Sequence, residues 1–169
     1  MTKKIDLAAA PTVSGSSYPA PFDAPCAPRL RYRLGDAAGL SHFGVNLTRL
    51  APGAWSSQRH WHSGEDEFVY VIEGELVLVT DAGEEVLRPG DCAGFKAGSA
   101  DGHHLQNRTH RDACFLEIGA RRPAQDEVTY PDIDLKVLPD RQGYTHRNGE
   151  PYPGAKAPKP GDRRCRRRL

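Results

Sequence analysis

Turn-forming residues divide the middle of this chain into segments that are too short for most helices. The stretches between these turns show no apolar repeat with the 3.6-residue period of a helix, and Phe68-Val69-Tyr70-Val71-Ile72 is rich in β-branched and aromatic residues. The pattern predicts an all-β sandwich or barrel of short strands. The turn signals lie at Gly35-Asp36, Pro52-Gly53, Glu73-Gly74, Asp81-Ala82-Gly83, Pro89-Gly90-Asp91 and Ala97-Gly98.

Length and composition limit the class of protein. The 169 residues are enough for one domain with a proper core and too few for two of ordinary size. A net charge of +1 gives no electrostatic case for nucleic acid as a partner, and no apolar stretch is long enough to span a membrane. The apolar piece 7–10 is too short for the core of a signal peptide, so we expect a cytoplasmic location. We expect the widely spaced Cys92 and Cys114 to be small core residues.

The two ends of the chain differ in composition from the middle. Residues 1–28 are rich in Ala, Pro and Ser, which predicts an extended N-terminal arm, and the barrel is expected over 29–121. Segment 122–161 is expected to pack on the barrel or on a second subunit, and the arginine-rich residues 162–169 are expected to form a disordered basic tail. We expect a homodimer, because small antiparallel sandwiches need their edge strands covered.

One group of polar residues has the spacing of a metal site. Alternate side chains of an extended strand share a face, so His60 and His62 point to the same place while Trp61 points away. Glu67 follows an acidic break and begins the next strand-like run. Imidazole nitrogens and carboxylate oxygens are metal ligands, and the pattern predicts one divalent ion, either zinc, iron, manganese or nickel.

A further histidine ligand is expected from the loop and strand near residues 99–107. Alternation puts His103, Leu105 and Asn107 on one side of this strand and His104 on the other, so both histidines cannot easily bind the same ion. We expect His103 to be the ligand, and His104 to point outward or to line a subunit contact.

These residues carry a family resemblance. The spacing His60-x-His62-x4-Glu67-x6-Gly74 matches the first signature of the cupin superfamily, and the region from Gly90-Asp91 to His103-x3-Asn107 resembles the second. The stretches HWHSGEDEFVYVIEGELVLV and GHHLQNR resemble more closely a group of small bacterial single-domain cupins, which are uncharacterised or labelled sugar-phosphate isomerases by loose analogy. The resemblance implies a jelly-roll-like double-stranded β-helix with a metal inside. It also implies ligand roles for His60, His62, Glu67 and His103.

The second signature departs from the family pattern in two places. Lys96 stands where the superfamily usually has proline, and the loop before His103 carries two extra residues. Strict counting would put Asp101 where the histidine belongs, so Asp101 stays an alternative fourth ligand. Glu65 and Asp66 are weaker alternatives to Glu67, because neither keeps the six-residue gap to the glycine that closes the first signature.

The pocket residues leave the chemistry open. Ser56 and Gln58 share a face with the first two histidines and are candidates for hydrogen-bonding a substrate, although polar residues can equally line a wet barrel interior. Tyr70 has the wrong parity to face the metal, and Glu117 is expected on the outside of its strand. The basic candidates for binding a phosphate are Lys96 and Arg59, of which Arg59 points away by parity.

Four protein ligands would leave positions open on a six-coordinate ion, which favours chemistry over a structural role. We therefore expect a metal-dependent enzyme that acts on a small polar metabolite, either as an isomerase of the sugar-phosphate type or as a dioxygenase. The alternative is a non-catalytic ligand-binding or sensor module in which the metal organises the pocket.

Overall fold

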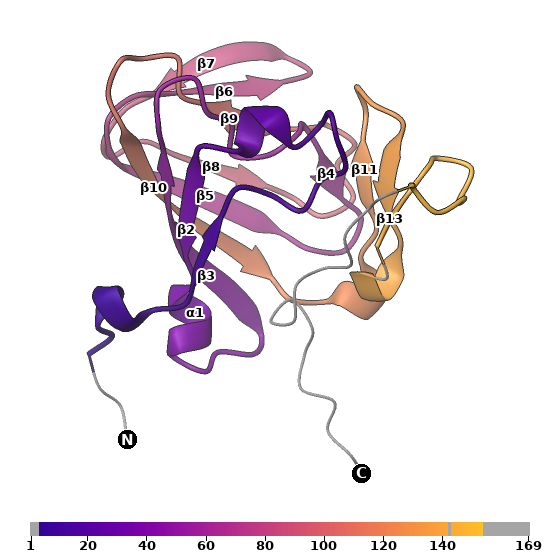
Figure 1. Ribbon diagram of the computed structural model, residues 1–169, viewed down its shortest axis with the longest axis horizontal. Helices are drawn as coiled ribbons and strands as arrows, with labels where there is room; N and C mark the ends of the chain where they lie inside the picture. Colours follow the sequence, from indigo (N-terminus) through magenta and orange to yellow (C-terminus); the bar gives the residue numbers. More distant parts are fainter. Residues whose placement is uncertain (1–3, 142, 154–169) are drawn as a thin grey trace.

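Almost all regular structure in this protein is β-strand (Figure 1). The computed structural model describes residues 4–141 and 143–153, so the predicted basic tail 162–169 and the end of segment 122–161 lie outside the described residues. The strands are β1 (Thr12–Ser14), β2 (Arg29–Tyr32), β3 (Phe43–Leu50), β4 (Trp61–His62), β5 (Glu67–Glu73), β6 (Leu76–Thr80), β7 (Gly83–Leu87), β8 (Cys92–Phe95), β9 (His104–Gln106), β10 (Ala113–Ala120), β11 (Val128–Tyr130), β12 (Leu135–Val137) and β13 (Tyr144–Thr145). The helical segments are α1 (Leu34–Ala37) and the 3-10 turns η1 (Leu7–Ala9), η2 (Ala24–Cys26), η3 (Pro123–Gln125) and η4 (Pro139–Arg141).

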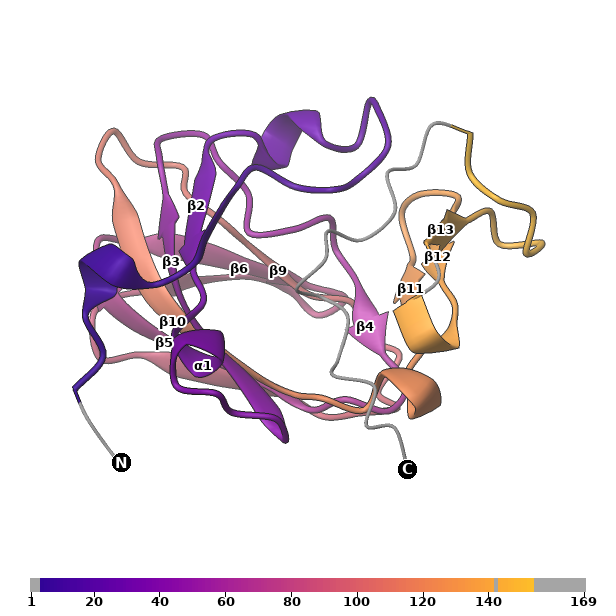
Figure 2. The ribbon, with the colours of Figure 1, turned by 60° about the horizontal axis from the view of Figure 1, so that its bottom comes forward.

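The strands form three antiparallel sheets within the described part of the chain. The largest has the order β1-β2-β3-β10-β5-β8, the second has the order β7-β6-β9, and the third joins the C-terminal strands to the barrel in the order β13-β12-β11-β4 (Figures 1 and 2). In the largest sheet β10 lies between β3 and β5, which precede it by many residues. Such long-range pairing brings side chains from distant parts of the chain onto one face. The predicted all-β class is confirmed.

The core of the barrel follows the two-residue alternation of its strands. On β5, Val69 and Val71 are buried, whereas Phe68, Tyr70 and Ile72 are exposed on the opposite face. Tyr70 therefore points away from the interior, as its parity predicts. The core cluster consists of Leu50, Ala54, Val69, Val71, Leu76, Leu78, Leu87, Leu105, Ala113 and Phe115.

A second apolar cluster joins the two ends of the described chain. It is built on buried residues of β11 and β12, against which Tyr18 and Phe22 of the N-terminal segment pack. The rings of Tyr18 and Tyr130 meet edge to face with their centroids 5.6 Å apart. Since β11 also pairs with β4, this cluster is anchored directly beside the predicted metal ligands.

The turn between β5 and β6 requires a glycine. Gly74 has a φ of 79°, and a Cβ atom added there would lie 2.7 Å from the backbone oxygen of Asp112. A side chain would therefore be strained at this position and would push the turn away from the start of β10.

The structure corrects one prediction about the core and limits the helices. Cys114 is buried but Cys92 is exposed, because Cys92 pairs with Tyr70 and so lies on the outer face of the large sheet. The prediction that Cys92 is a core residue was wrong. No helix among the described residues is long and apolar enough to cross a membrane.

Candidate metal centre

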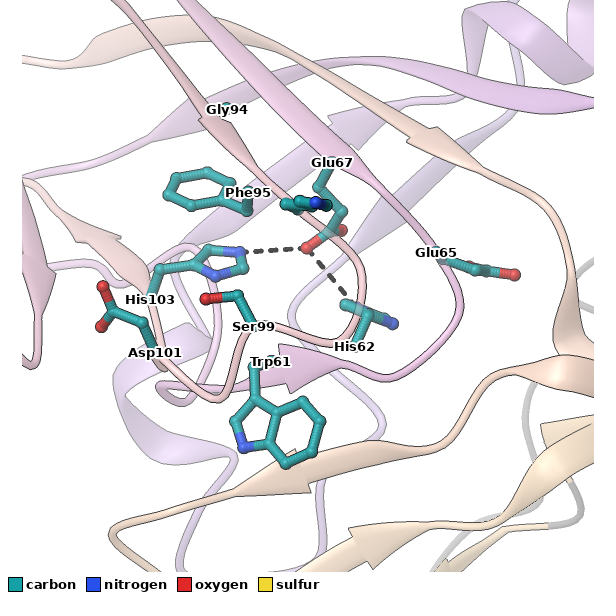
Figure 3. A pocket seen from close by; sticks show the side chains of 10 residues that line it. Trp61, His62, Glu65, Glu67, Gly94, Phe95, Ser99, Asp101 and His103 are labelled. Atoms are coloured by element: carbon teal, nitrogen blue, oxygen red, sulfur yellow. Dashed lines mark hydrogen bonds and ion pairs between the residues drawn. The ribbon is translucent and has the colours of Figure 1, made fainter.

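The two predicted histidine segments lie directly beside each other. His60 and His103 form an isolated antiparallel bridge, with each backbone N–H donating to the other's carbonyl at 3.2 and 2.8 Å. This pairing turns both side chains to the same side, whereas Trp61 points away from the cluster (Figure 3). Glu67 reaches the same point from the start of β5.

Three imidazole nitrogens converge on one carboxylate oxygen. Oε2 of Glu67 lies 3.0 Å from Nε2 of His103, 3.4 Å from Nε2 of His62 and 3.6 Å from Nε2 of His60 (Figure 3 shows the first two). Ligand atoms of His60, His62 and Glu67 all lie within 4.8 Å of one another. Ligand atoms that each lie about 2.1 Å from one ion are separated from one another by distances similar to those between these side-chain atoms. The His/Glu cluster could therefore hold a metal ion.

The hydrogen bonds of two histidines prepare them as ligands. Nδ1 of His60 lies 2.9 Å from the carbonyl oxygen of Gln58, and Nδ1 of His62 lies 2.7 Å from Oδ2 of Asp126. A carbonyl or carboxylate only accepts, so each Nδ1 carries the proton and each Nε2 directs its lone pair at Glu67. Lone pairs that face a carboxylate repel it unless a cation or proton lies between them. This donor set fits a divalent cation.

The environment keeps these groups in the protonation states that a metal requires. Burial lowers the pKa of His60, which favours its neutral form. Burial alone would raise the pKa of Glu67, but its three histidine neighbours together hold it well below its usual range. His103 is fixed by stacking, since its ring lies parallel to that of Phe95 with the centroids 3.5 Å apart.

Asp126 is a candidate site residue that the sequence did not reveal. It is buried, and besides the bond with His62 its Oδ1 accepts the backbone N–H of Gly64 at 3.0 Å. Asp126, His62 and Glu65 form a second group of potential ligand atoms within 4.8 Å of one another. Because Nδ1 of His62 donates its hydrogen bond to Asp126, we interpret Asp126 as the residue that orients this ligand. Nothing in the local pattern around position 126 marks it.

The alternative carboxylates are held elsewhere. Asp101 is exposed, and its Oδ1 accepts the backbone N–H of Asp81 at 2.7 Å. Oε1 of Glu65 accepts the backbone N–H of Arg122, and its side chain points away from the cluster in Figure 3. Asp66 accepts a backbone N–H at 2.8 Å. The geometry thus brings together the four preferred residues and leaves these three outside.

His104 was predicted to point outward, but it does not. It is buried, its Nδ1 lies 3.0 Å from the carbonyl oxygen of Ser57, and its ring meets the edge of Trp55 with the centroids 4.8 Å apart. Burial lowers the pKa of His104 to about 4, so its ring is neutral. The expected outward orientation was wrong, because Trp55 and Ser57 of an earlier segment contact this ring.

The two predicted pocket residues have different surroundings. Ser56 lines the larger of two cavities beside the histidine cluster, although its hydroxyl oxygen already accepts a hydrogen bond from the N–H of Leu105 at 2.9 Å. Gln58 donates through Nε2 to the carbonyl oxygen of Phe22 at 2.7 Å, and it is not among the residues that line the two cavities beside the cluster. Its place in a substrate pocket stays a prediction that this contact does not support.

Two cavities meet at Glu67. The smaller, of about 180 Å³, forms an outer mouth whose wall includes Lys96, Ser99 and Asp101. The larger, of about 990 Å³, extends from the histidines along the six-stranded sheet and reaches exposed residues such as Leu40. Glu117 lines this larger cavity, so the prediction that it lies on the outside of its strand was wrong. Glu117 on β10 pairs with Val69 on β5, whose side chain is buried, so both side chains lie on the inner face of the sheet.

The fold and the site define the class of this protein as a small antiparallel β-barrel with a potential metal site of histidines and glutamate at its interior. More specifically, the chain belongs to the cupin superfamily: the family model described as "Cupin domain" matches residues 46–119. The predicted double-stranded β-helix and the family resemblance are thereby confirmed.

Solved structures place the chain more closely within the superfamily. A protein from Silicibacter pomeroyi, named a sugar phosphate isomerase from a cupin superfamily, is 46% identical with a TM-score of 0.83, covering 92% of this chain and 100% of that one. A protein from Acidithiobacillus ferrooxidans, provisionally named a sugar phosphate isomerase, is 35% identical with a TM-score of 0.61, covering 72% of each chain. The polyketide cyclase RemF from Streptomyces resistomycificus shares the fold, at 19% identity and a TM-score of 0.56, over 71% of this chain and 80% of that one. A search of curated proteins found no match.

Proposed function

We propose that this protein is a metal-dependent enzyme that acts on a small polar carbonyl metabolite, and that its reaction is an isomerisation of the sugar-phosphate type. The observation that carries the proposal is the convergence of three histidine nitrogens on Glu67 at the point where two cavities meet. The names of the two similar structures support the choice of an isomerisation.

The ligands of the ion would be His60, His62, His103 and Glu67. When bound, a divalent ion supplies Lewis acidity that polarises a substrate carbonyl. Neighbouring groups hold the Nε2 atoms of two histidines in place for the metal. The carbonyl of Gln58 fixes the ring of His60, and Asp126 fixes that of His62. The ring of Phe95 covers one face of His103.

The outer mouth offers a place for a phosphate group. Lys96 lies on its wall together with Ser99, so both a basic and a hydroxyl-bearing residue line the same small cavity. Arg59, the other basic candidate, is occupied elsewhere by two hydrogen bonds to Asp132, at 2.6 and 2.7 Å, and by a contact with Asp81. We therefore propose Lys96 as the phosphate-binding residue.

We also propose that the protein is a homodimer. Support comes from apolar side chains that remain exposed on the outer face of the six-stranded sheet, namely Phe43, Phe68, Tyr70 and Ile72. Sedimentation of Tyr70→Lys beside the unaltered protein tests the proposal. A dimer that the substitution converts to monomer would support it, and a monomeric unaltered protein would contradict it.

The enzymatic proposal is tested by metal analysis and turnover. Protein purified without chelators is analysed for bound metal and then tested against a panel of aldose and ketose phosphates, with interconversion followed by NMR. We expect metal-dependent interconversion that Glu67→Gln abolishes and that the exposed variant Glu84→Gln retains. Oxygen consumption by the iron-loaded protein would favour the dioxygenase. Metal binding without turnover of any compound would favour the non-catalytic ligand-binding module.

A further inference from the structure

A polar cluster lies on the wall of the larger cavity, separate from the histidines. It consists of Arg31 on β2, Asn46 on β3 and Glu117 on β10. Nε and Nη2 of Arg31 lie 2.8 and 3.0 Å from the two carboxylate oxygens of Glu117, and Nδ2 of Asn46 donates to Glu117 at 3.3 Å. The side chains of Arg31 and Glu117 remain 27% and 19% exposed, so this ion pair faces the cavity and is not sealed in the core.

Strand register places this cluster next to the candidate metal centre. Glu67 pairs with Gly119 across β5 and β10, and Glu117 lies two residues away on the same face of β10. Glu117 is therefore a diagonal neighbour of Glu67, and the Cα atoms of such neighbours are about 7–8 Å apart. A Cβ atom added at Gly119 would lie 3.7 Å from Oε1 of Glu67, so the absence of a side chain there leaves space beside that carboxylate.

The groups in this cluster match hydroxyl groups. Among the described residues, the hydrogen bonds given above leave Nη1 of Arg31 as a donor and Oδ1 of Asn46 as an acceptor. The carboxylate of Glu117 has further lone pairs, since its two oxygens can accept about four hydrogen bonds. The charges of Arg31 and Glu117 neutralise each other, which makes the cluster better suited to a neutral polar group than to an anion. A hydroxyl group both donates and accepts, so neighbouring hydroxyls can use both kinds of site.

We infer that Arg31, Asn46 and Glu117 form a binding site for hydroxyl groups on the ligand carbons beyond its carbonyl end, with that end lying at the histidine cluster. The ligand class is then a short polyhydroxylated ketone or aldehyde, phosphorylated or not. This inference rests on the proposed function, because the histidine cluster is taken as the place of the carbonyl.

Two ketones that differ only in distal hydroxyls test the inference. Erythrulose and 1-hydroxybutan-2-one share the same hydroxyketone end, but only erythrulose has hydroxyls on its third and fourth carbons. Binding of each to zinc-loaded protein is measured by calorimetry. Hydrogen bonds to charged groups predict that erythrulose binds at least about tenfold more tightly. We expect Glu117→Gln to reduce this preference to within about twofold.

Matched variants separate the binding role from a structural one. Glu84→Gln removes a similar arginine partner, since Glu84 holds Arg108 at 2.6 and 2.7 Å on the exposed surface, and it should keep the full preference. Asn46→Ala leaves the ion pair intact and should lower the preference, which keeps the test decisive if Glu117→Gln fails to fold.

The outcomes distinguish this inference from the proposed function. Equal binding of both ketones to the unaltered protein, or a preference that survives Glu117→Gln and Asn46→Ala, would overturn the inference and leave the proposed function standing. Binding of neither ketone to the zinc-loaded protein would also overturn the inference, whereas the proposed function is contradicted only if the metal-loaded protein interconverts no aldose or ketose phosphate.

Discussion

Replacing Asp126 by asparagine should weaken metal binding although Asp126 is not itself one of the four proposed ligands. The carboxylate accepts two hydrogen bonds, from Nδ1 of His62 at 2.7 Å and from the N–H of Gly64 at 3.0 Å. An asparagine of the same size has one acceptor oxygen and one NH₂ group, so it cannot accept at both places. If its NH₂ group faces His62, the ring must present a lone pair at Nδ1 and a proton at Nε2, which is the wrong tautomer for a ligand.

The expected loss can be estimated in two ways. Residues that orient a metal-binding histidine typically contribute about 10–100-fold to metal affinity. One lost hydrogen bond to a charged group corresponds to about 1.5–3 kcal/mol, which is roughly the same range. We therefore expect Asp126→Asn to reduce zinc affinity by about 10–100-fold, measured by competition with a chelator. Thermal denaturation of the metal-free protein measures any separate effect on folding.

The chain contains a matched control for this experiment. Asp134 accepts hydrogen bonds from Nδ1 of His146 and from the N–H of Arg147, both at 2.8 Å. Its side chain, unlike that of Asp126, is exposed, and neither partner belongs to the histidine cluster. Asp134→Asn should leave zinc affinity unchanged. Unchanged affinity in Asp126→Asn, with the protein folded, would refute the reasoning that Asp126 orients His62.

Three further predictions follow from the structure. His103→Ala should lower the zinc content of the purified protein whereas Asp101→Asn should not, and metal analysis showing the reverse would make Asp101 the ligand. Gly74→Ala should destabilise the fold by about 1–3 kcal/mol more than Gly39→Ala in urea denaturation, because both glycines have a positive φ but only at Gly74 would the new methyl group meet backbone atoms, the closest at 2.7 Å. Equal losses would show that the backbone conformation alone decides the cost. At pH 8 iodoacetamide should label Cys92 in the folded protein and the two buried cysteines of the described chain only after unfolding, as read by peptide mapping, and early labelling of the buried pair would contradict the packing.

Much of the candidate site follows from short-range patterns. The two-residue alternation of strands places His60 with His62 and Glu67 with Val69, whatever lies elsewhere in the chain. The spacing to Gly74 reflects a turn whose positive φ only glycine adopts easily. The choice of His103 over His104 also comes from alternation.

Alternation shows which residues share a face but does not show what covers that face. His104 was expected to point outward, yet the segment that contains Trp55 and Ser57 lies over it. Glu117 was expected on the outside, yet its strand lies between β3 and β5 with that face toward the cavity. Both errors have the same cause, because the pairing of distant strands decides which side becomes the interior.

The sequence by itself determined the β class, the turn positions and the local grouping of histidines and glutamate, because these depend on residues within one strand or turn. Only the tertiary structure decided that Asp126 stands behind His62 and that Arg31 meets Glu117 beside Glu67. These partners are separated by tens of residues, and their contact depends on how strands from different parts of the chain pair and close into a barrel.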